Sequence, residues 1–324
     1  MQFTVYCVGP DPSDCADALQ QALAQRELPV RVTPAPVTAA TITRELGLLL
    51  RDDTLLGALI QRPFKQTALA YCQELTHASQ VLGGVNVLAR RASGLVYGDN
   101  TDVQAFVAAL GEVGVRRVRT ALVLGTGQAA RIALAGLREL NCARYLVGYR
   151  SPRRPMELSS QLRSLRRQLA YFPLREMTDF FDWAEDSRVF DGRSAMSAPG
   201  GKPGDDTVKR WDLLVNATPV GMADDDTPLI ENQNFLRCFE RVFDMVPRAD
   251  GTQQQRVAED AGVPALGGAR LAELAQDHAL EFWQRELRRR QLAADGKPDP
   301  ADEQRGMAAG ANAPRVPVLK RRRR

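Results

Sequence analysis

Lys65 and Asp102 are the residues whose types and positions could carry out acid–base chemistry. Lys65 follows an apolar run at 55–60 that predicts a strand, and Asp102 follows Asn100 and Thr101, either of which can cap a helix. A lysine at the end of a strand and an aspartate opening a helix form a proton-transfer pair if the fold brings them within about 2.6–3.2 Å. The alternative is that Lys65 is an ordinary solvated residue and Asp102 an acid favoured by the helix dipole.

The elements that would position this pair alternate between strands and helices through residue 113. Periodicity predicts strands at 3–8, 30–32, 55–60, 85–88 and 95–97, and helices at 16–24, 41–50, 63–75 and 101–110. Pro63 suits the first turn of the third helix, because proline there loses no hydrogen bond. The alternation predicts an α/β fold with a largely parallel sheet.

A second unit begins with the apolar run at 119–124, which leads into Gly125-Thr126-Gly127-Gln128-Ala129-Ala130 and a helix to about residue 140. In this G-x-G-x-x-A pattern, Gly125 permits a tight turn, Gly127 lets a pyrophosphate approach the backbone, and the small last residue lets the helix pack on the strand. Phosphate charge would lie at the helix N-terminus, beside Gln128 and Ala129. The pattern favours dinucleotide binding; the alternative is a tight turn without a ligand.

The next predicted strand, at 143–147, is followed by a basic segment that contains Arg150, Ser151 and Arg154. An NAD site usually carries an Asp or Glu at this strand end for the ribose hydroxyls, and none is present. Arginine suits a ribose 2′-phosphate, so the sequence predicts NADP as the cofactor. The alternative is a solvated basic loop, because the whole region is basic.

The rest of the chain continues the alternation. We expect strands at 169–172, 211–215, 241–246 and 264–266, and helices at 252–261 and 269–291. Residues 192–206 are rich in Gly, Pro and Ser and predict a flexible surface insertion. Residues 293–324 lack periodicity and predict a disordered basic tail.

Composition places the chain among ordinary globular proteins. Its 324 residues suffice for two domains, and 44% are apolar and 25% charged. No run approaches the roughly 18 apolar residues of a membrane span, and the start lacks a signal-peptide pattern, so we expect a cytoplasmic protein without membrane contact. The five cysteines are scattered and form no C-x-x-C pair, and there are only two histidines, so we expect buried free thiols and no metal site.

The net charge of +4 is concentrated at the end of the chain. Residues 285–324 carry twelve Lys or Arg against five Asp or Glu, a net +7, which leaves −3 for the rest. A mildly acidic body does not describe a nucleic-acid-binding domain. The terminal run 320–324 could touch nucleic acid or anionic lipid, but a solvated tail is favoured.

Taken together, the segments resemble the shikimate dehydrogenase family from about Tyr6 to Trp283. The family patterns G-x-N-V-T-x-P-x-K, G-A-V-N-T, G-x-N-T-D, the cofactor loop, N-R-T, N-A-T-P-x-G-M and Y-D-M correspond, in this order, to residues 57–65, 83–87, 98–102, 125–131, 149–151, 216–222 and 243–245. The resemblance implies a substrate-binding domain, 1–113 completed by helix 269–291, that faces a Rossmann-type NADP-binding domain, 114–268, across a cleft.

The resemblance also implies roles for individual residues. Hydride would pass between NADPH and the ring carbonyl of 3-dehydroshikimate, with Lys65 and Asp102 as the catalytic pair and Asn86 on a substrate hydroxyl. Reducing a ketone leaves an alkoxide that needs a proton and a nearby positive charge, which a lysine held by a carboxylate provides. The implied cofactor-binding residues are Gly125, Gly127, Gln128, Ala129, Arg150, Ser151, Arg154, Thr218 and Met245.

Departures from the family pattern cluster on the substrate side. The paired serines that hold the substrate carboxylate fall on Ser13 and Cys15. The substrate-contacting Asn and Thr of the third strand become Leu59 and Gln61. A tyrosine becomes Pro247, and a glutamine of the last helix falls on Ala275, with Gln276 one place on. The implied substrate-binding residues are therefore Ser13, Gln61, Asn86 and Gln276, in an altered acid-binding pocket.

The leading interpretation is an NADP-dependent oxidoreductase that acts on shikimate, quinate or a related cyclic hydroxy acid, as a monomer or homodimer. The unaltered biosynthetic reaction is an alternative within the same class. A non-catalytic NADP-binding sensor or partner-binding protein is the alternative from another class, although a binder has no need of the proton-transfer pair.

Overall fold

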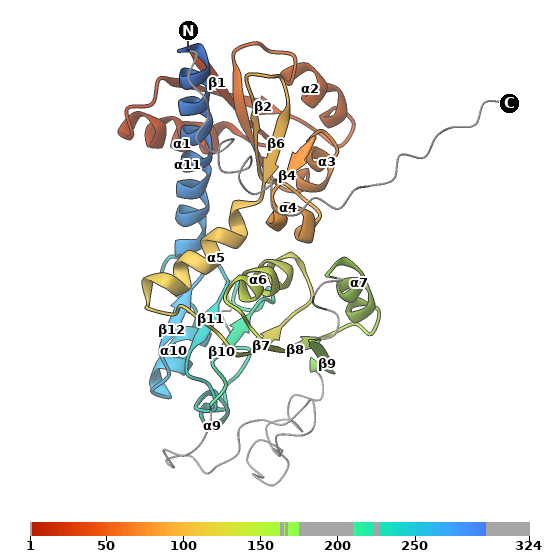
Figure 1. The fold of residues 1–324 in the computed structure, drawn as a ribbon. Helices are drawn as coiled ribbons and strands as arrows, with labels where there is room; N and C mark the ends of the chain where they lie inside the picture. The colour runs from red at the N-terminus through yellow and green to blue at the C-terminus, as the bar shows by residue number, and fades with distance from the viewer. Residues whose placement is uncertain (1, 163–164, 166–167, 175–209, 223–226, 296–324) are drawn as a thin grey trace, which may run out of the picture.

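The computed structural model describes residues 2–162, 165, 168–174, 210–222 and 227–295. The predicted insertion at 192–206 and residues 296–324 of the predicted tail lie outside the described residues. Within them the chain forms two six-stranded sheets, one above the other in Figure 1, with helices on both. The predicted α/β class is confirmed.

The first sheet has the order β2-β1-β3-β5-β6-β4. Its strands are β1 (Phe3–Gly9), β2 (Val30–Pro36), β3 (Leu55–Ile60), β4 (Glu74–Leu75), β5 (Val87–Arg90) and β6 (Val96–Asp99). β1 is parallel to β2 and β3, whereas β5 is antiparallel to both β3 and β6. The prediction of a largely parallel sheet is thus only half right, because the five-residue turn from Arg91 to Leu95 joins β5 directly to its antiparallel neighbour.

Four helices precede the chain's passage to the second sheet: α1 (Ser13–Gln25), α2 (Ile42–Leu49), α3 (Lys65–Leu69) and α4 (His77–Leu82). The predicted helix 63–75 is wrong beyond Leu69. The backbone N–H groups of Gln73 and Thr76 bond to the carbonyls of Val96 and Gly98, at 2.9 and 3.0 Å, so the chain joins the sheet edge as β4 instead. α4, which was not predicted, begins at a Thr76 cap.

The second sheet is wholly parallel, in the order β12-β11-β10-β7-β8-β9. Its strands are β7 (Thr120–Leu124), β8 (Arg144–Tyr149), β9 (Leu169–Pro173), β10 (Leu213–Asn216), β11 (Val242–Asp244) and β12 (Ala265–Gly267). In chain order from the β9 edge, this is the 3-2-1-4-5-6 arrangement of dinucleotide-binding folds. The chain crosses between its two halves after β9, so ligands are expected beyond the carboxyl ends of β7 and β10.

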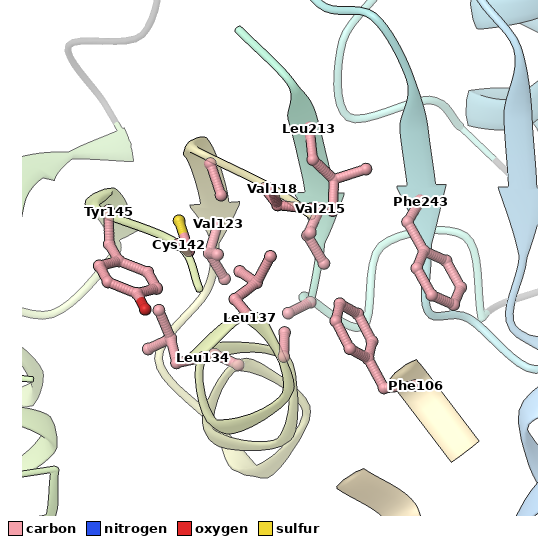
Figure 2. Close-up of a cluster of buried hydrophobic side chains, with 14 of the residues drawn as sticks. Phe106, Val118, Val123, Leu134, Leu137, Cys142, Tyr145, Leu213, Val215 and Phe243 are labelled. Atoms are coloured by element: carbon pink, nitrogen blue, oxygen red, sulfur yellow. The ribbon is translucent and has the colours of Figure 1, made fainter. Parts of the chain in front are cut away.

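The remaining helices cover the second sheet and link it to the first. They are α5 (Thr101–Glu112), α6 (Gln128–Glu139), α7 (Arg154–Gln161), α9 (Gln233–Leu236), α10 (Gln253–Asp260) and α11 (Ala269–Ala294); α7 and α9 were not predicted. The rings of Phe106 on α5 and Phe243 on β11 stack with centroids 5.0 Å apart, beside Leu134 and Leu137 of α6 (Figure 2). α5 therefore packs in the core of the second sheet, while its first residue adjoins the first sheet.

The long helix α11 returns the chain to the first sheet (Figure 1). Trp283 is fully buried there, and its Nε1 donates to the Leu88 carbonyl at 3.0 Å. A side chain on Gly57 would put its Cβ 2.3 Å from that nitrogen, so only glycine fits. Helices α1 and α11 cover one face of the sheet around Val5, while α2 and α3 cover the other.

No helix among the described residues is long and apolar enough to cross a membrane.

Candidate active site

Lys65 is the first residue of α3, directly after the chain leaves β3. Its carbonyl accepts from the N–H of Val85 at 2.9 Å, which fixes the backbone next to Asn86, the residue before β5. The side chain is 19% exposed, so it is shielded by protein on most sides and still open to a ligand.

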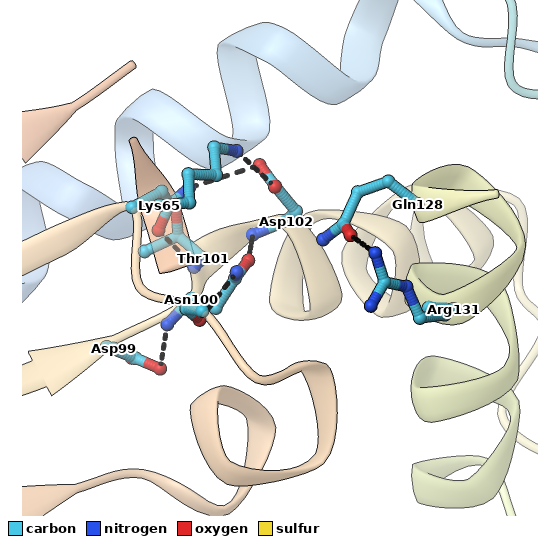
Figure 3. Close-up of polar contacts among 9 residues, drawn as sticks. Lys65, Asp99, Asn100, Thr101, Asp102, Gln128 and Arg131 are labelled. Atoms are coloured by element: carbon cyan, nitrogen blue, oxygen red, sulfur yellow. Dashed lines mark hydrogen bonds and ion pairs between the residues drawn. The ribbon is translucent and has the colours of Figure 1, made fainter. Parts of the chain in front are cut away.

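Asp102 lies in the first turn of α5, where the Asn100 side chain accepts from its N–H. Lys65 Nζ donates to Asp102 Oδ2 at 2.6 Å. Figure 3 shows the two side chains directed toward each other. The two residues are therefore within the distance expected of a proton-transfer pair, and the alternative of two independent solvated charges is wrong. Asp102 is 21% exposed, so the carboxylate is likewise only partly open.

Asn86 holds this carboxylate from the other side. Its Nδ2 donates to Asp102 Oδ1 at 3.1 Å and to Thr101 Oγ1 at 3.0 Å, and its Oδ1 accepts from Thr101 N–H at 2.8 Å. Asn86 is 5% exposed, and these bonds tie the residue before β5 to the start of α5. Lys65, Asn86 and Asp102 thus form one hydrogen-bonded group at the end of the first sheet.

The glycine turn of the second sheet lies next to this group. Gly125 has φ +115°, and a Cβ there would lie 2.7 Å from the Ala217 carbonyl oxygen, so the turn requires glycine. Gly127 caps α6 without a side-chain hydrogen bond, and a Cβ on it would meet open space. α5 and α6 are in contact, and Figure 3 shows Gln128 at the start of α6 beyond Asp102. Free N–H groups at such a helix start can bind phosphate.

The predicted basic residues gather beyond the carboxyl end of β8. Arg150 and Ser151 follow this strand, and Arg154, which opens α7, is exposed and forms an ion pair with Glu157 at 3.0 Å. Burial and the positive charge of Arg154 lower the pKa of Arg131 on α6, which places the two guanidinium groups near each other. Arg131 stands in the glycine motif but was not among the predicted ligands.

Thr218 and Met245 follow β10 and β11, and a buried network fixes both. The amide of Asn216 donates to Asp244 at 3.0 Å, and the N–H and hydroxyl of Thr218 donate to the Asn216 Oδ1. Thr252 donates to the other Asp244 oxygen at 2.6 Å, and Met245 N–H bonds to the Asn216 carbonyl. Both predicted residues therefore lie at the carboxyl edge of the sheet, near the glycine turn.

The residues predicted to bind the substrate come together less closely than the catalytic residues. Gln61 follows β3 and packs against Gly9, where an added Cβ would lie 1.8 Å from its Oε1. Ser13 is exposed at the start of α1, and Gln276 is partly buried on the stretch of α11 that adjoins α5. The structure thus groups Lys65, Asn86 and Asp102 closely, but it does not place Ser13 among buried polar groups.

Two thiols that the prediction did not pair lie beside Gln61. A hydrogen bond with the Cys7 thiol, opposed by burial and aided by a bond with Gln61, lowers the pKa of Cys15 to about 6. The same bond and burial raise the pKa of Cys7. Among the described residues, no group of three or more His, Cys, Asp or Glu could hold a metal ion.

Comparison with known proteins agrees with the family resemblance seen in the sequence. The chain is 30% identical over 224 residues to a shikimate dehydrogenase (NADP(+)) of Salinibacter ruber, covering 68% of this chain and 70% of that one. It is 29% identical over 237 residues to the enzyme of the same name from Symbiobacterium thermophilum, covering 72% of each. No family model matches the chain.

Solved structures agree on the fold. A shikimate 5-dehydrogenase of Thermus thermophilus, in complex with NADP(H) and shikimate, superposes with a TM-score of 0.62 at 24% identity, covering 87% of this chain and 93% of that one. A shikimate 5-dehydrogenase of Listeria monocytogenes gives 0.69 at 17% identity, covering 95% and 96%. Together with the sequence relatives, these likenesses establish that the chain belongs to the shikimate dehydrogenase family.

Proposed function

We propose that this protein is an NADP-dependent oxidoreductase that transfers hydride reversibly between NADP(H) and a cyclic hydroxy or keto acid such as shikimate or quinate. The relatives named above are NADP(+)-dependent shikimate dehydrogenases. The observation that carries the proposal is the 2.6 Å contact between Lys65 and Asp102, held by Asn86 next to the glycine turn. A protein that only senses NADP has no use for such a pair.

The two sheets belong to two proposed domains, one for the substrate and one for the cofactor. Residues 1–113 with α11 would form the substrate-binding domain, and residues 114–268 the NADP-binding domain. The glycine turn, the uncapped start of α6 and the arginines beyond β8 fit the pyrophosphate and 2′-phosphate of NADP. When bound, NADPH supplies the hydride. The cofactor ligands would be the nine predicted residues from Gly125 to Met245, with Arg131 added.

Lys65 would act on the substrate oxygen. As hydride reaches the carbonyl carbon, the carbonyl electron pair moves to oxygen, and the resulting alkoxide takes a proton from Lys65 Nζ. The Asp102 carboxylate holds the ammonium group in place, and the positive charge stabilises the developing oxyanion. In the oxidation direction, neutral Lys65 takes the hydroxyl proton.

Asn86, Gln61, Gln276 and Ser13 are proposed to contact the substrate. Asn86 donates both amide hydrogens to Thr101 and Asp102, so it would contact a substrate hydroxyl as an acceptor through Oδ1. Gln61 directly follows β3. The replacement of a carboxylate-binding hydroxyl by Cys15 favours a substrate other than shikimate itself, or a weaker affinity for it, since a thiol is a poor hydrogen-bond donor.

An absorbance screen with NADP(+) and a panel of cyclic hydroxy acids, with calorimetry of NADP(+) binding alone, tests the proposal. We expect turnover on at least one acid and a binding signal for the cofactor. Lys65→Ala should abolish the turnover and keep the binding, while Gln66→Ala, an exposed neighbour on α3, should keep both. Cofactor binding with no turnover on any acid would favour the sensor function instead.

We further propose that the protein works in the cytoplasm, which the absence of a disulfide among its five cysteines supports, and that it is a monomer or homodimer. Light scattering coupled to gel filtration gives the mass, and a tetramer would contradict this.

A further inference from the structure

Cys7 and Cys15 form a second reactive pair, at the same end of the first sheet as Lys65, that hydride transfer does not use. Successive side chains of a strand alternate between faces, so Val5 and Cys7 of β1 point to the same face. Val5 packs there with Leu19 and Leu23 of α1. Cys7 therefore faces α1.

The spacing of residues on α1 also places Cys15 against Cys7. Cys15, Leu19 and Leu23 are spaced four residues apart, so they share one face of α1. Since Leu19 and Leu23 pack on β1, Cys15 is one turn along that face toward the carboxyl end of the strand, above Cys7. The contact between α1 and β1 agrees with this placement.

The two sulfur atoms differ in access. Cys7 is 0% exposed, whereas Cys15 is partly exposed, so a reagent from solvent reaches Cys15 first. Cys15 is also the third residue of the 13-residue helix α1, where the helix dipole stabilises a thiolate. A partly exposed thiol in the first turn of a helix, with a second thiol buried beneath it, is the arrangement of an attacking and a resolving cysteine.

We propose that Cys15 is a site of oxidation by hydroperoxides and that Cys7 resolves it as an intramolecular disulfide. The Cys15 thiolate attacks one peroxide oxygen, the O–O bond breaks, and Cys15 sulfenic acid forms. The leaving hydroxide, or the alkoxide of an organic peroxide, takes a proton from solvent and departs as water or an alcohol. The Cys7 thiol then attacks the sulfenic sulfur, the S–S bond forms, and the hydroxyl leaves as water. Two thiols lose two electrons in total, and the peroxide gains them.

The disulfide would act on the proposed substrate site through Gln61, and this part rests on the proposed function. Gln61 packs on Gly9, two residues after Cys7, and its N–H donates to the Val8 carbonyl at 2.9 Å. Disulfide formation draws the start of α1 toward β1 and so shifts the end of β1 on which Gln61 packs. Because Gln61 stands four residues before Lys65, substrate binding should weaken while the catalytic pair stays intact.

The chemical test uses the full-length protein and hydrogen peroxide. We expect peptide mapping without reduction to yield a Cys7–Cys15 disulfide that dithiothreitol reverses. In Cys7→Ala, a sulfenic-acid trap should label Cys15 instead. Cys238→Ser is the matched control, because Cys238 is also partly exposed, and it should leave the disulfide yield unchanged. Oxidation of Cys15 no faster than that of Cys238, or pairing of Cys15 with another cysteine, would overturn the proposal.

A kinetic test separates this proposal from the proposed function. On an acid that the enzyme turns over, oxidation should raise KM between about twofold and tenfold, the effect of one lost hydrogen bond, with kcat unchanged. Cys15→Ser should show no response to peroxide. If no acid is turned over, the proposed function fails and the disulfide mapping still decides the chemistry. If turnover is found and the wild type loses kcat instead of affinity, the route through Gln61 is wrong.

Discussion

Asn86 Nδ2 donates to Asp102 Oδ1 at 3.1 Å, while the other carboxylate oxygen of Asp102 binds Lys65. The carboxylate therefore has two partners that fix its plane: Asn86, directly before β5, and Lys65 at the start of α3.

The first prediction concerns Asn86→Ala. The substitution leaves Thr101 N–H and one Asp102 oxygen without a partner in a buried site, which should lower the free energy of unfolding by about 1–3 kcal/mol. Because Asp102 then loses its orientation, kcat should fall as well. Urea denaturation and steady-state kinetics measure the two effects. Asn234→Ala, at an exposed position, should stay within about 0.5 kcal/mol of the wild type; equal effects of both variants would contradict the assignment.

Lys65→Ala should lower kcat by about 10²- to 10⁴-fold, the usual contribution of a positioned proton donor. Calorimetry should show unchanged affinity for NADP(+), because the lysine lies in the part proposed to hold the substrate. Gln66→Ala, one residue along α3, controls for disturbance of the helix. A Lys65→Ala enzyme that keeps a third of the wild-type kcat would remove Lys65 from the mechanism.

Arg154→Ala should weaken NADP(+) binding about tenfold or more, since a hydrogen bond between charged groups contributes about 1.5–3 kcal/mol. NAD(+), which lacks the 2′-phosphate, should bind almost as before. The matched control is Arg144→Ala at the opposite end of β8, where the side chain is also exposed. Equal losses of affinity for both cofactors would show that Arg154 stabilises the loop and does not bind the 2′-phosphate.

Acid stability should depend on Asp52. Burial raises its pKa, but the hydrogen bonds from Thr54 and Tyr6 and the charge of Arg90 outweigh burial, so the net pKa is lowered. A carboxyl group with a lowered folded-state pKa stabilises the fold above its unfolded pKa of about 3.9, and this contribution is lost as the pH falls through the folded value.

Asp52→Asn should therefore be less stable than the wild type at pH 6, and the gap should shrink toward pH 3. Denaturation at several pH values measures it. Asp53→Asn is the control, because the Asp53 side chain is 88% exposed. A gap that stays constant with pH would mean that the charge of Asp52 contributes nothing.

Local patterns in the sequence were enough to predict some parts of this fold. The strand before Gly125, the turn and helix α6 follow one another without a break, so hydrophobic period and glycine chemistry determine them together. Lys65 and Asp102 could also be paired, although 37 positions separate them, because each stands where a strand or helix begins or ends.

Other parts depend on distant partners. β4 forms because residues 73–76 pair with β6, and no pattern within residues 63–75 predicts that pairing. Similarly, Asn216 and Asp244 bond across 28 positions, and only the adjacency of β10 and β11 brings them together. Cys7 and Cys15 lie close in the sequence, but their meeting depends on how α1 folds back over β1, which spacing alone does not determine.

The packing of Trp283 against Leu88 also affects how the protein folds during its synthesis. During synthesis, the six strands of the first sheet leave the ribosome well before residues 280–287, which cover the apolar surface around Leu56 and Val87. At about 5–20 residues per second the wait is roughly 10–40 s. The first sheet therefore exposes this apolar surface to the cell until α11 has been made.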